Sequence, residues 1–149
     1  MRHTPGGCLY RLGLALLDLE DPRRVIRRSD DARRRLHATT ARLRASLTEA
    51  GYPIHQGTEQ IISLEAGSEP AAMVLRDTLE ERDVVGSIFC APATSKNRAM
   101  VRLTLNASLT DAEIEHVEKV AREVAPLLKP WDWPIARRNR AAAAEHRGA

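Results

Sequence analysis

Several chemical signatures are missing from this sequence of 149 residues. It has two cysteines, not in a C-x-x-C spacing, so no disulfide framework is expected and a reducing cytoplasm is the default compartment. Its five histidines are isolated and show no metal-ligand spacing such as H-E-x-x-H. It also has no glycine-rich phosphate loop and no G-x-S-x-G motif. These absences argue against metalloenzymes, P-loop proteins and serine hydrolases.

Aromatic residues and long apolar runs are also scarce. Aromatic residues make up 3% of the sequence, so we expect a core of aliphatic side chains. The apolar run from Leu12 to Leu19 is shorter than a membrane span and lacks a small-residue cleavage site, which predicts neither an anchor nor a signal peptide. A net charge of +3 is too weak to indicate nucleic-acid binding. The length and the 43% hydrophobic content are typical of one soluble domain.

The hydrophobic patterns predict an α+β fold, with helices packed on a small, mainly antiparallel sheet. A long leading helix is expected at about residues 22–50, because apolar or small side chains recur with helical spacing up to Gly51. The pair Asp30-Asp31 is a place where this helix could kink or restart. Short β-branched or alternating segments predict three strands, near residues 60–65, 84–90 and 100–106.

Capping residues predict two further helices. Ser68 is the expected N-cap of a helix after the first strand, and Thr110 with Glu113 forms a capping box before the last helix. We expect the chain to divide into a partial N-terminal helix at 1–20, a small domain at 21–128 that includes the long helix, and a partly disordered tail at 129–149.

The long helix is rich in arginine, with nine between Arg23 and Arg44. Such a helix could bind nucleic acid or an acidic partner. The arginines avoid the apolar stripe, however, and no recognised nucleic-acid motif accompanies them. A solvent-exposed outer face is therefore the favoured interpretation.

One arginine outside this helix has a more distinctive setting. The segment from Met100 to Asn106 alternates apolar and polar side chains, which places Arg102 at the centre of the polar face of a strand. Its guanidinium group is a planar fork suited to a carboxylate, and a central strand holds it more firmly than a loop. The alternative is a structural ion pair with an acid on a neighbouring element. These residues alone leave both roles open.

Three stretches carry a family resemblance: QIISLE at residues 60–65, GSIFCAPATSKN at 86–97 and RLTLN at 102–106. Together they resemble the C-terminal domain of the α-oxoamine synthases, which are class I/II aminotransferase-like, fold-type I enzymes that use pyridoxal 5'-phosphate (PLP). The middle stretch is most similar to quorum-sensing autoinducer synthases, which make α-aminoketones from an acyl-CoA and an amino acid. The resemblance covers roughly residues 33–125.

The resemblance implies a function. The chain would be the C-terminal substrate-binding domain, as a fragment or a split half, of a cytoplasmic PLP-dependent enzyme that condenses an acyl-CoA with an amino acid. In the family, the arginine of the R-L motif binds the amino-acid carboxylate, and by its position in that motif this role falls on Arg102. The polar loop at 94–97 would lie near the mouth of the cleft. The implied partners are the two substrates and a large catalytic domain or homodimer partner, with no membrane.

The sequence departs from the family in its missing catalytic residues. The family's cofactor lysine and its other PLP-binding residues lie in a large upstream domain that this sequence does not contain. Lys96 falls in the loop of the small domain rather than in the family's lysine motif. No residue is therefore assigned to catalysis, cofactor binding or metal binding, and we expect the chain alone to be inactive.

Two other classes of function stay open. The order strand, helix, strand, strand, helix also suits a ferredoxin-like ligand-binding or interaction module, and a fold alone does not establish function. A nucleic-acid-binding protein that uses the arginine-rich helix is the less favoured alternative. Salt-dependent binding of RNA or DNA would support the nucleic-acid class. Loss of amino-acid binding on substitution of Arg102 would support the PLP-enzyme class.

Overall fold

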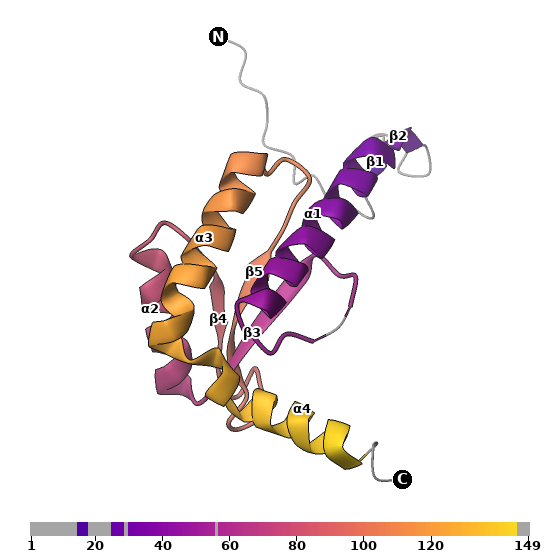
Figure 1. Cartoon of the computed structure of the whole chain (residues 1–149). Coiled ribbons are helices and arrows are strands. Elements are labelled where there is room, and N and C mark those ends of the chain that lie inside the picture. Colours follow the sequence, from indigo (N-terminus) through magenta and orange to yellow (C-terminus); the bar gives the residue numbers. More distant parts are fainter. Residues whose placement is uncertain (1–14, 18–24, 29, 56, 146–149) are drawn as a thin grey trace.

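A computed structural model describes residues 15–17, 25–28, 30–55 and 57–145 of the chain (Figure 1). Its elements, in order, are β1 (Ala15–Leu17), β2 (Val25–Arg28), α1 (Asp30–Glu49), β3 (Ile61–Gly67), α2 (Glu69–Glu80), β4 (Ser87–Phe89), β5 (Ala99–Thr104), α3 (Asp111–Leu128), the 3-10 helix η1 (Pro130–Asp132) and α4 (Pro134–Glu145). This arrangement confirms the predicted α+β fold class. Within the described ranges, none of the helices has the length and apolar character needed to cross a membrane.

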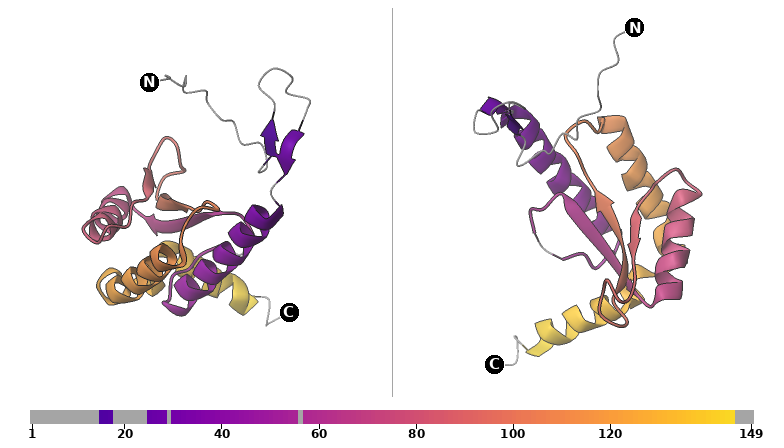
Figure 2. Two further views of the ribbon diagram at one scale, coloured as in Figure 1. Left: turned by 90° about the horizontal axis from the view of Figure 1, so that it is seen from above. Right: turned by 180° about the vertical axis from the view of Figure 1, so that it is seen from behind.

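The central sheet is antiparallel and has the order β3-β5-β4 (Figure 2). Strand β5 is hydrogen-bonded on both sides, and its register places Arg102 opposite Ser63 of β3 and Ser87 of β4. Because side chains alternate between the two faces of a strand, Val101 and Leu103 point into the core and are buried. Arg102 therefore points to the opposite face, as the period-two pattern predicts.

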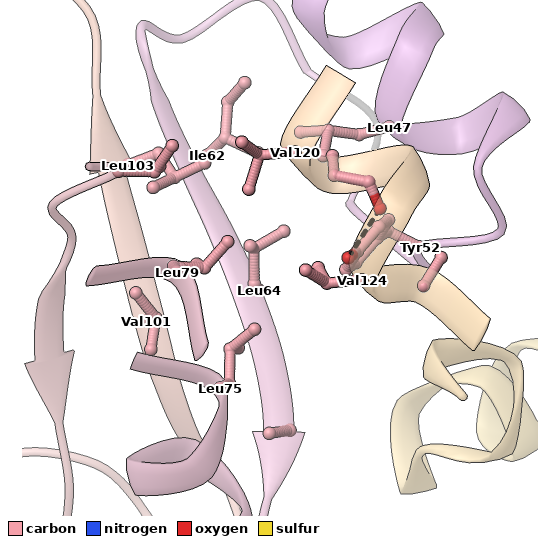
Figure 3. Packing of buried hydrophobic residues seen from close by; sticks show 14 of the residues in the cluster. Leu47, Tyr52, Ile62, Leu64, Leu75, Leu79, Val101, Leu103, Val120 and Val124 are labelled. Carbon is pink, nitrogen blue, oxygen red and sulfur yellow. Dashed lines mark hydrogen bonds between the residues drawn. The ribbon is translucent and has the colours of Figure 1, made fainter. Parts of the chain in front are cut away.

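The core lies between one face of the sheet and the helices α1, α2 and α3 (Figure 2). Leu47 of α1, Leu75 of α2 and Val124 of α3 are almost fully buried and converge on Leu64 and Val101 of the sheet (Figure 3). The predicted N-caps are both confirmed: the Ser68 hydroxyl accepts from the Ala71 N–H, and Thr110 and Glu113 form the capping box of α3.

The opposite face of the sheet is only partly covered by described residues. We call it the open face and define it by its partly buried or exposed side chains: Ile61, Ser63, Ser87, Phe89, Met100, Arg102 and Thr104. No helix lies across its centre among the residues drawn in colour in Figure 2.

The start of the long helix differs from the prediction. The helix predicted at 22–50 begins at Asp30, and Val25–Arg28 forms strand β2 instead. Val25 and Ile26 are β-branched and favour an extended backbone. The carboxylates of Asp30 and Asp31 in the first turn complement the helix dipole, which makes Asp30 a favourable start.

The segment predicted as a partial helix at 1–20 is described only at Ala15–Leu17. These residues form strand β1, which pairs antiparallel with β2, so the helix prediction is wrong for them. The rest of that segment lies outside the described residues.

Strand β4 is shorter than the strand predicted there. Pairing of the strand expected at 84–90 begins only at Ser87. Asp83 has a positive φ of 59°, and the Val85 side chain is 80% exposed, so the chain is still turning there. Gly86 then passes so close to the sheet that an added Cβ would lie 2.4 Å from Val101 Cγ1.

The tail is more ordered than predicted. Of the residues expected to be partly disordered at 129–149, those at 130–145 form η1 and α4, and those at 146–149 lie outside the described residues. The buried Trp133 indole meets the Tyr52 ring edge-on, with centroids 5.8 Å apart, and its Nε1–H donates to the Leu128 carbonyl. This aromatic contact ties the start of α4 to the core. The proposed division of the chain at residues 20 and 128 stays a prediction.

Candidate functional site

Arg102 lies at the centre of the open face, on the middle strand of the sheet. Its guanidinium carbon Cζ lies 4.1 Å from the centroid of the Phe89 ring, which is a cation–π contact. Phe89 pairs with Met100, which lies two residues before Arg102 on the same face of β5. The Arg102 side chain therefore reaches the ring diagonally across the two strands. Sequence analysis missed Phe89, although it is the sole phenylalanine of the chain.

The hydrogen-bonding capacity of Arg102 is not used up within the described part of the chain. Its Nε atom is buried and has no hydrogen-bond partner there. The described residues also place no carboxylate within ion-pair distance of it. A buried donor that lacks an acceptor costs about 1–3 kcal/mol, so a ligand carboxylate that satisfied Nε would gain binding energy. The carboxylate-binding role of Arg102 stays a prediction.

The described arginines of α1 have structural partners. Arg42 donates from Nε and Nη2 to the two carboxylate oxygens of Glu118 on α3, at 2.9 Å each, and this hydrogen bonding raises the pKa of Arg42. Arg44 donates to the carbonyls of His55, Glu59 and Ile61 at 2.7–3.1 Å. These arginines hold α1 to α3 and to the chain entering β3, which favours the structural interpretation of the arginine-rich helix.

A charged cluster lies at the far end of β3. The Glu65 side chain is 4% exposed and accepts hydrogen bonds from Arg98 Nη2 and Nε, at 2.8 and 3.2 Å, and from Arg138 of α4. Burial raises the pKa of the Glu65 carboxyl, but the hydrogen bonds and charges of the two arginines outweigh it, so its pKa is lowered. In contrast to Arg102, both of these arginines already bind a carboxylate.

The polar loop predicted near a cleft mouth connects β4 to β5. A small cavity of about 140 Å³ is lined by Thr94, Ser95, Lys96 and Asn97 of this loop, by Gly67 at the end of β3 and by Glu69 at the start of α2. The Thr94 hydroxyl is buried and has no partner among the described residues. Whether this loop borders a substrate cleft stays a prediction.

A larger cavity does not include the predicted site residue. It has a volume of about 430 Å³ and lies at the other end of β5 from this loop, between α1, α3 and the segment before β4. Its apolar lining includes Leu43, Val84, Leu103, Leu105, Ile114 and Val117. Apolar residues with helical or strand periodicity do not reveal such a cavity, because the same pattern produces a filled core.

The three lysines of the chain lie away from Arg102 in the fold. Lys119 lies on α3, and Lys129 is the C-cap of the same helix. Helix α3 covers the opposite face of the sheet. Lys96 lies in the loop before β5. Among the described residues there is also no group of histidine, cysteine or acidic side chains that could hold a metal ion.

Comparison with known proteins matches residues 14–120 to the family aminotransferase class I and II. CAI-1 autoinducer synthase from Vibrio campbellii is 41% identical over 108 residues, which cover 72% of this chain and 27% of that protein. 8-Amino-7-oxononanoate synthase from Cronobacter sakazakii is 33% identical over 91 residues, which cover 61% of this chain and 24% of that protein. The chain thus spans about a quarter of the length of these curated relatives.

Solved structures share the fold. Serine palmitoyltransferase from Sphingomonas wittichii aligns with a TM-score of 0.63 and 22% identity, over 67% of this chain and 26% of that chain. A structure of serine palmitoyltransferase from S. paucimobilis with bound PLP aligns with a TM-score of 0.62 and 18% identity, over 66% of this chain and 25% of that chain. Such identities show the fold alone, but the family match extends over most of the chain. The chain therefore belongs to the aminotransferase class I and II family, a family of PLP-dependent enzymes.

Proposed function

We propose that this chain is the C-terminal substrate-binding domain of a PLP-dependent α-oxoamine synthase, and that Arg102 binds the carboxylate of its amino-acid substrate. The complete enzyme would act in the cytoplasm and condense the amino acid with an acyl-CoA. The 41% identity to the CAI-1 autoinducer synthase makes an α-aminoketone signal molecule the favoured product. The rest of the enzyme, on the same or a separate chain, would supply the catalytic residues.

The observation that carries the proposal is a guanidinium on the open face with no carboxylate partner among the described residues. A structural arginine in this position would have an acid beside it, as Arg42 has Glu118 and Arg98 has Glu65. Arg102 instead has a buried Nε without an acceptor among the described residues and a ring against one face. A planar fork held on a central strand is suited to two parallel hydrogen bonds to one carboxylate.

The described residues do not form a PLP site. A covalent PLP site needs a lysine directed at the cofactor and polar groups for its phosphate and ring nitrogen. The three lysines lie on α3 and in the loop before β5, and none of them shares the open face with Arg102. The role proposed for this chain is therefore limited to binding and orienting the amino-acid carboxylate, and no chemical step is assigned to its residues.

The proposal is tested by completing the enzyme, with the chain co-expressed with the large domain of a family relative. Arg102→Lys keeps the charge but removes the fork, so one of two charge-assisted hydrogen bonds is lost. The KM for the amino acid should rise roughly ten- to a hundredfold, while the KM for the acyl-CoA changes little. Arg102→Ala should have a larger effect on the same KM.

Arg42→Lys is the matched control. Arg42 has a bidentate contact with Glu118 but lies on α1, on the other side of the sheet. This variant should lower the melting temperature and leave the amino-acid KM near the wild-type value. If Arg102→Lys behaved in the same way, Arg102 would be a structural residue and the proposed function would lose its support.

A further inference from the structure

We propose that Phe89 is a positioning residue that fixes the guanidinium plane of Arg102 and thereby sets the affinity of the open face for a carboxylate. This inference rests on the proposed function of Arg102. It concerns the 4.1 Å contact between the Arg102 Cζ atom and the Phe89 ring centroid, which the family resemblance does not predict.

The location of Phe89 makes it a firm support. It ends the short strand β4, and its chain neighbour Ile88 packs against the hydrophobic core on the opposite face. Ile88 pairs with Val101, which is fully buried, so the backbone beneath Phe89 is tied directly to the central strand. The backbone that carries the ring is therefore anchored to the strand that carries Arg102.

The contact restrains Arg102 without using its N–H groups. A free arginine side chain has about 2 kcal/mol of rotamer entropy to lose when it is immobilised. The cation–π contact with the ring removes part of that freedom in advance, because it attracts the guanidinium without requiring a hydrogen bond to it. The ring contact takes up none of the N–H donors of Arg102 in a hydrogen bond, whereas the ion pair of Arg98 with Glu65 engages the Nε and Nη2 atoms of Arg98.

The partners of Arg102 on the two adjacent strands have short side chains. Ser63 and Ser87 are its direct partners on the two adjacent strands, and both are small and uncharged. The ring thus contacts the guanidinium, and the two serines place neither a charge nor a bulky side chain beside it. The buried Nε without an acceptor is on this same group. Together these features describe a preorganised receptor for a carboxylate.

The test uses the full 149-residue chain and acetate as the carboxylate probe. The Nε–Hε signal of Arg102 in a ¹H–¹⁵N NMR spectrum is assigned by its loss in Arg102→Lys. We expect it to carry a ring-current shift from Phe89 and to move when acetate is added, with chloride at equal ionic strength as the reference. In Phe89→Leu the ring-current shift should vanish and the acetate dissociation constant should rise roughly three- to tenfold.

Two further variants separate positioning from stability. Phe89→Tyr keeps an aromatic face and should restore acetate affinity to within about twofold of wild type. Ile88 lies on the same strand but faces the core. The variant Ile88→Val should therefore lower the melting temperature without changing acetate affinity. Unchanged acetate affinity in Phe89→Leu, with binding lost in Arg102→Lys, would overturn the role of Phe89 and leave the proposed function intact. An Arg102 signal that does not respond to acetate in the wild-type chain would overturn both.

Discussion

Replacement of Glu65 by glutamine should weaken the attachment of α4 to the sheet. Glutamine has nearly the same shape, but it carries no charge and keeps only one acceptor oxygen, so its amide NH2 group faces one of the two arginines. Removal of one partner from a buried ion pair costs about 3–5 kcal/mol. The arginine side chains are 53% and 50% exposed, so water screens their charges and solvates them in the variant. We therefore expect a loss of about 1–3 kcal/mol, or a fall in Tm of roughly 3–10 °C.

The size of this loss should depend on pH. Burial raises the pKa of Glu65, and the hydrogen bonds and charges of the two arginines lower it further than burial raises it, so its pKa in the folded chain lies below the ordinary value. Stability gained from the charged carboxylate is then fully present above the unfolded-state pKa and is lost as the pH falls through the folded-state pKa. The difference between wild type and Glu65→Gln should be largest at neutral pH and should shrink in acid.

Urea unfolding followed by circular dichroism, at neutral pH and in steps down to about pH 3.5, measures this difference. Glu59→Gln is the matched control, because Glu59 is 64% exposed and its ion pair with Arg44 should contribute at most about 1 kcal/mol. A Glu65→Gln variant as stable as the control, or a difference that stayed constant into acid, would refute the role given to this cluster.

Two further predictions concern the core. Tyr52→Phe removes the hydrogen bond from the Tyr52 hydroxyl to the Ala121 carbonyl, 3.1 Å away, and should cost about 0.5–1.5 kcal/mol in urea unfolding. Burial raises the pKa of Tyr52 to about 12, so stability should fall as the pH rises from the unfolded value of 10.0 towards 12, and this fall should be smaller in Tyr52→Phe. Leu75→Ala empties a fully buried site between α2 and the sheet and should cost about 2–5 kcal/mol, whereas Leu75→Met should cost less than about 1.5 kcal/mol. Equal losses in the two Leu75 variants would contradict the packing described for α2.

Local sequence patterns predict much of this fold. The alternation from Met100 to Thr104 gives both the central strand and the face on which Arg102 lies. The caps Ser68 and Thr110 mark the starts of α2 and α3, because a side-chain acceptor three residues before a free N–H is a local feature. These elements are predictable because their causes lie within a few residues of sequence.

The features that were missed depend on contacts between distant residues. The stack of Arg102 on Phe89 is set by the register of β4 against β5, which no single segment encodes. Likewise, Arg138 meets Glu65 across 73 residues, so an alanine- and arginine-rich tail gives no local sign that α4 is anchored. At Val25–Arg28, helical spacing and β-branched side chains compete, and tertiary pairing with β1 decides in favour of a strand.

The hydrogen bond from Arg44 to the Ile61 carbonyl also affects the edge of the sheet formed by β3. The Gln60 carbonyl accepts a hydrogen bond from the N–H of Leu105, which follows β5, so the next carbonyl, that of Ile61, points towards the edge of β3 with which no described strand pairs. An exposed edge of this kind is a template on which another chain can add a strand. The charged guanidinium of Arg44 donates a hydrogen bond to the Ile61 carbonyl. The strand at the opposite edge of the sheet, β4, is only three residues long. The contact of Arg44 thus removes one free acceptor from this edge, which disfavours the addition of a strand from another chain.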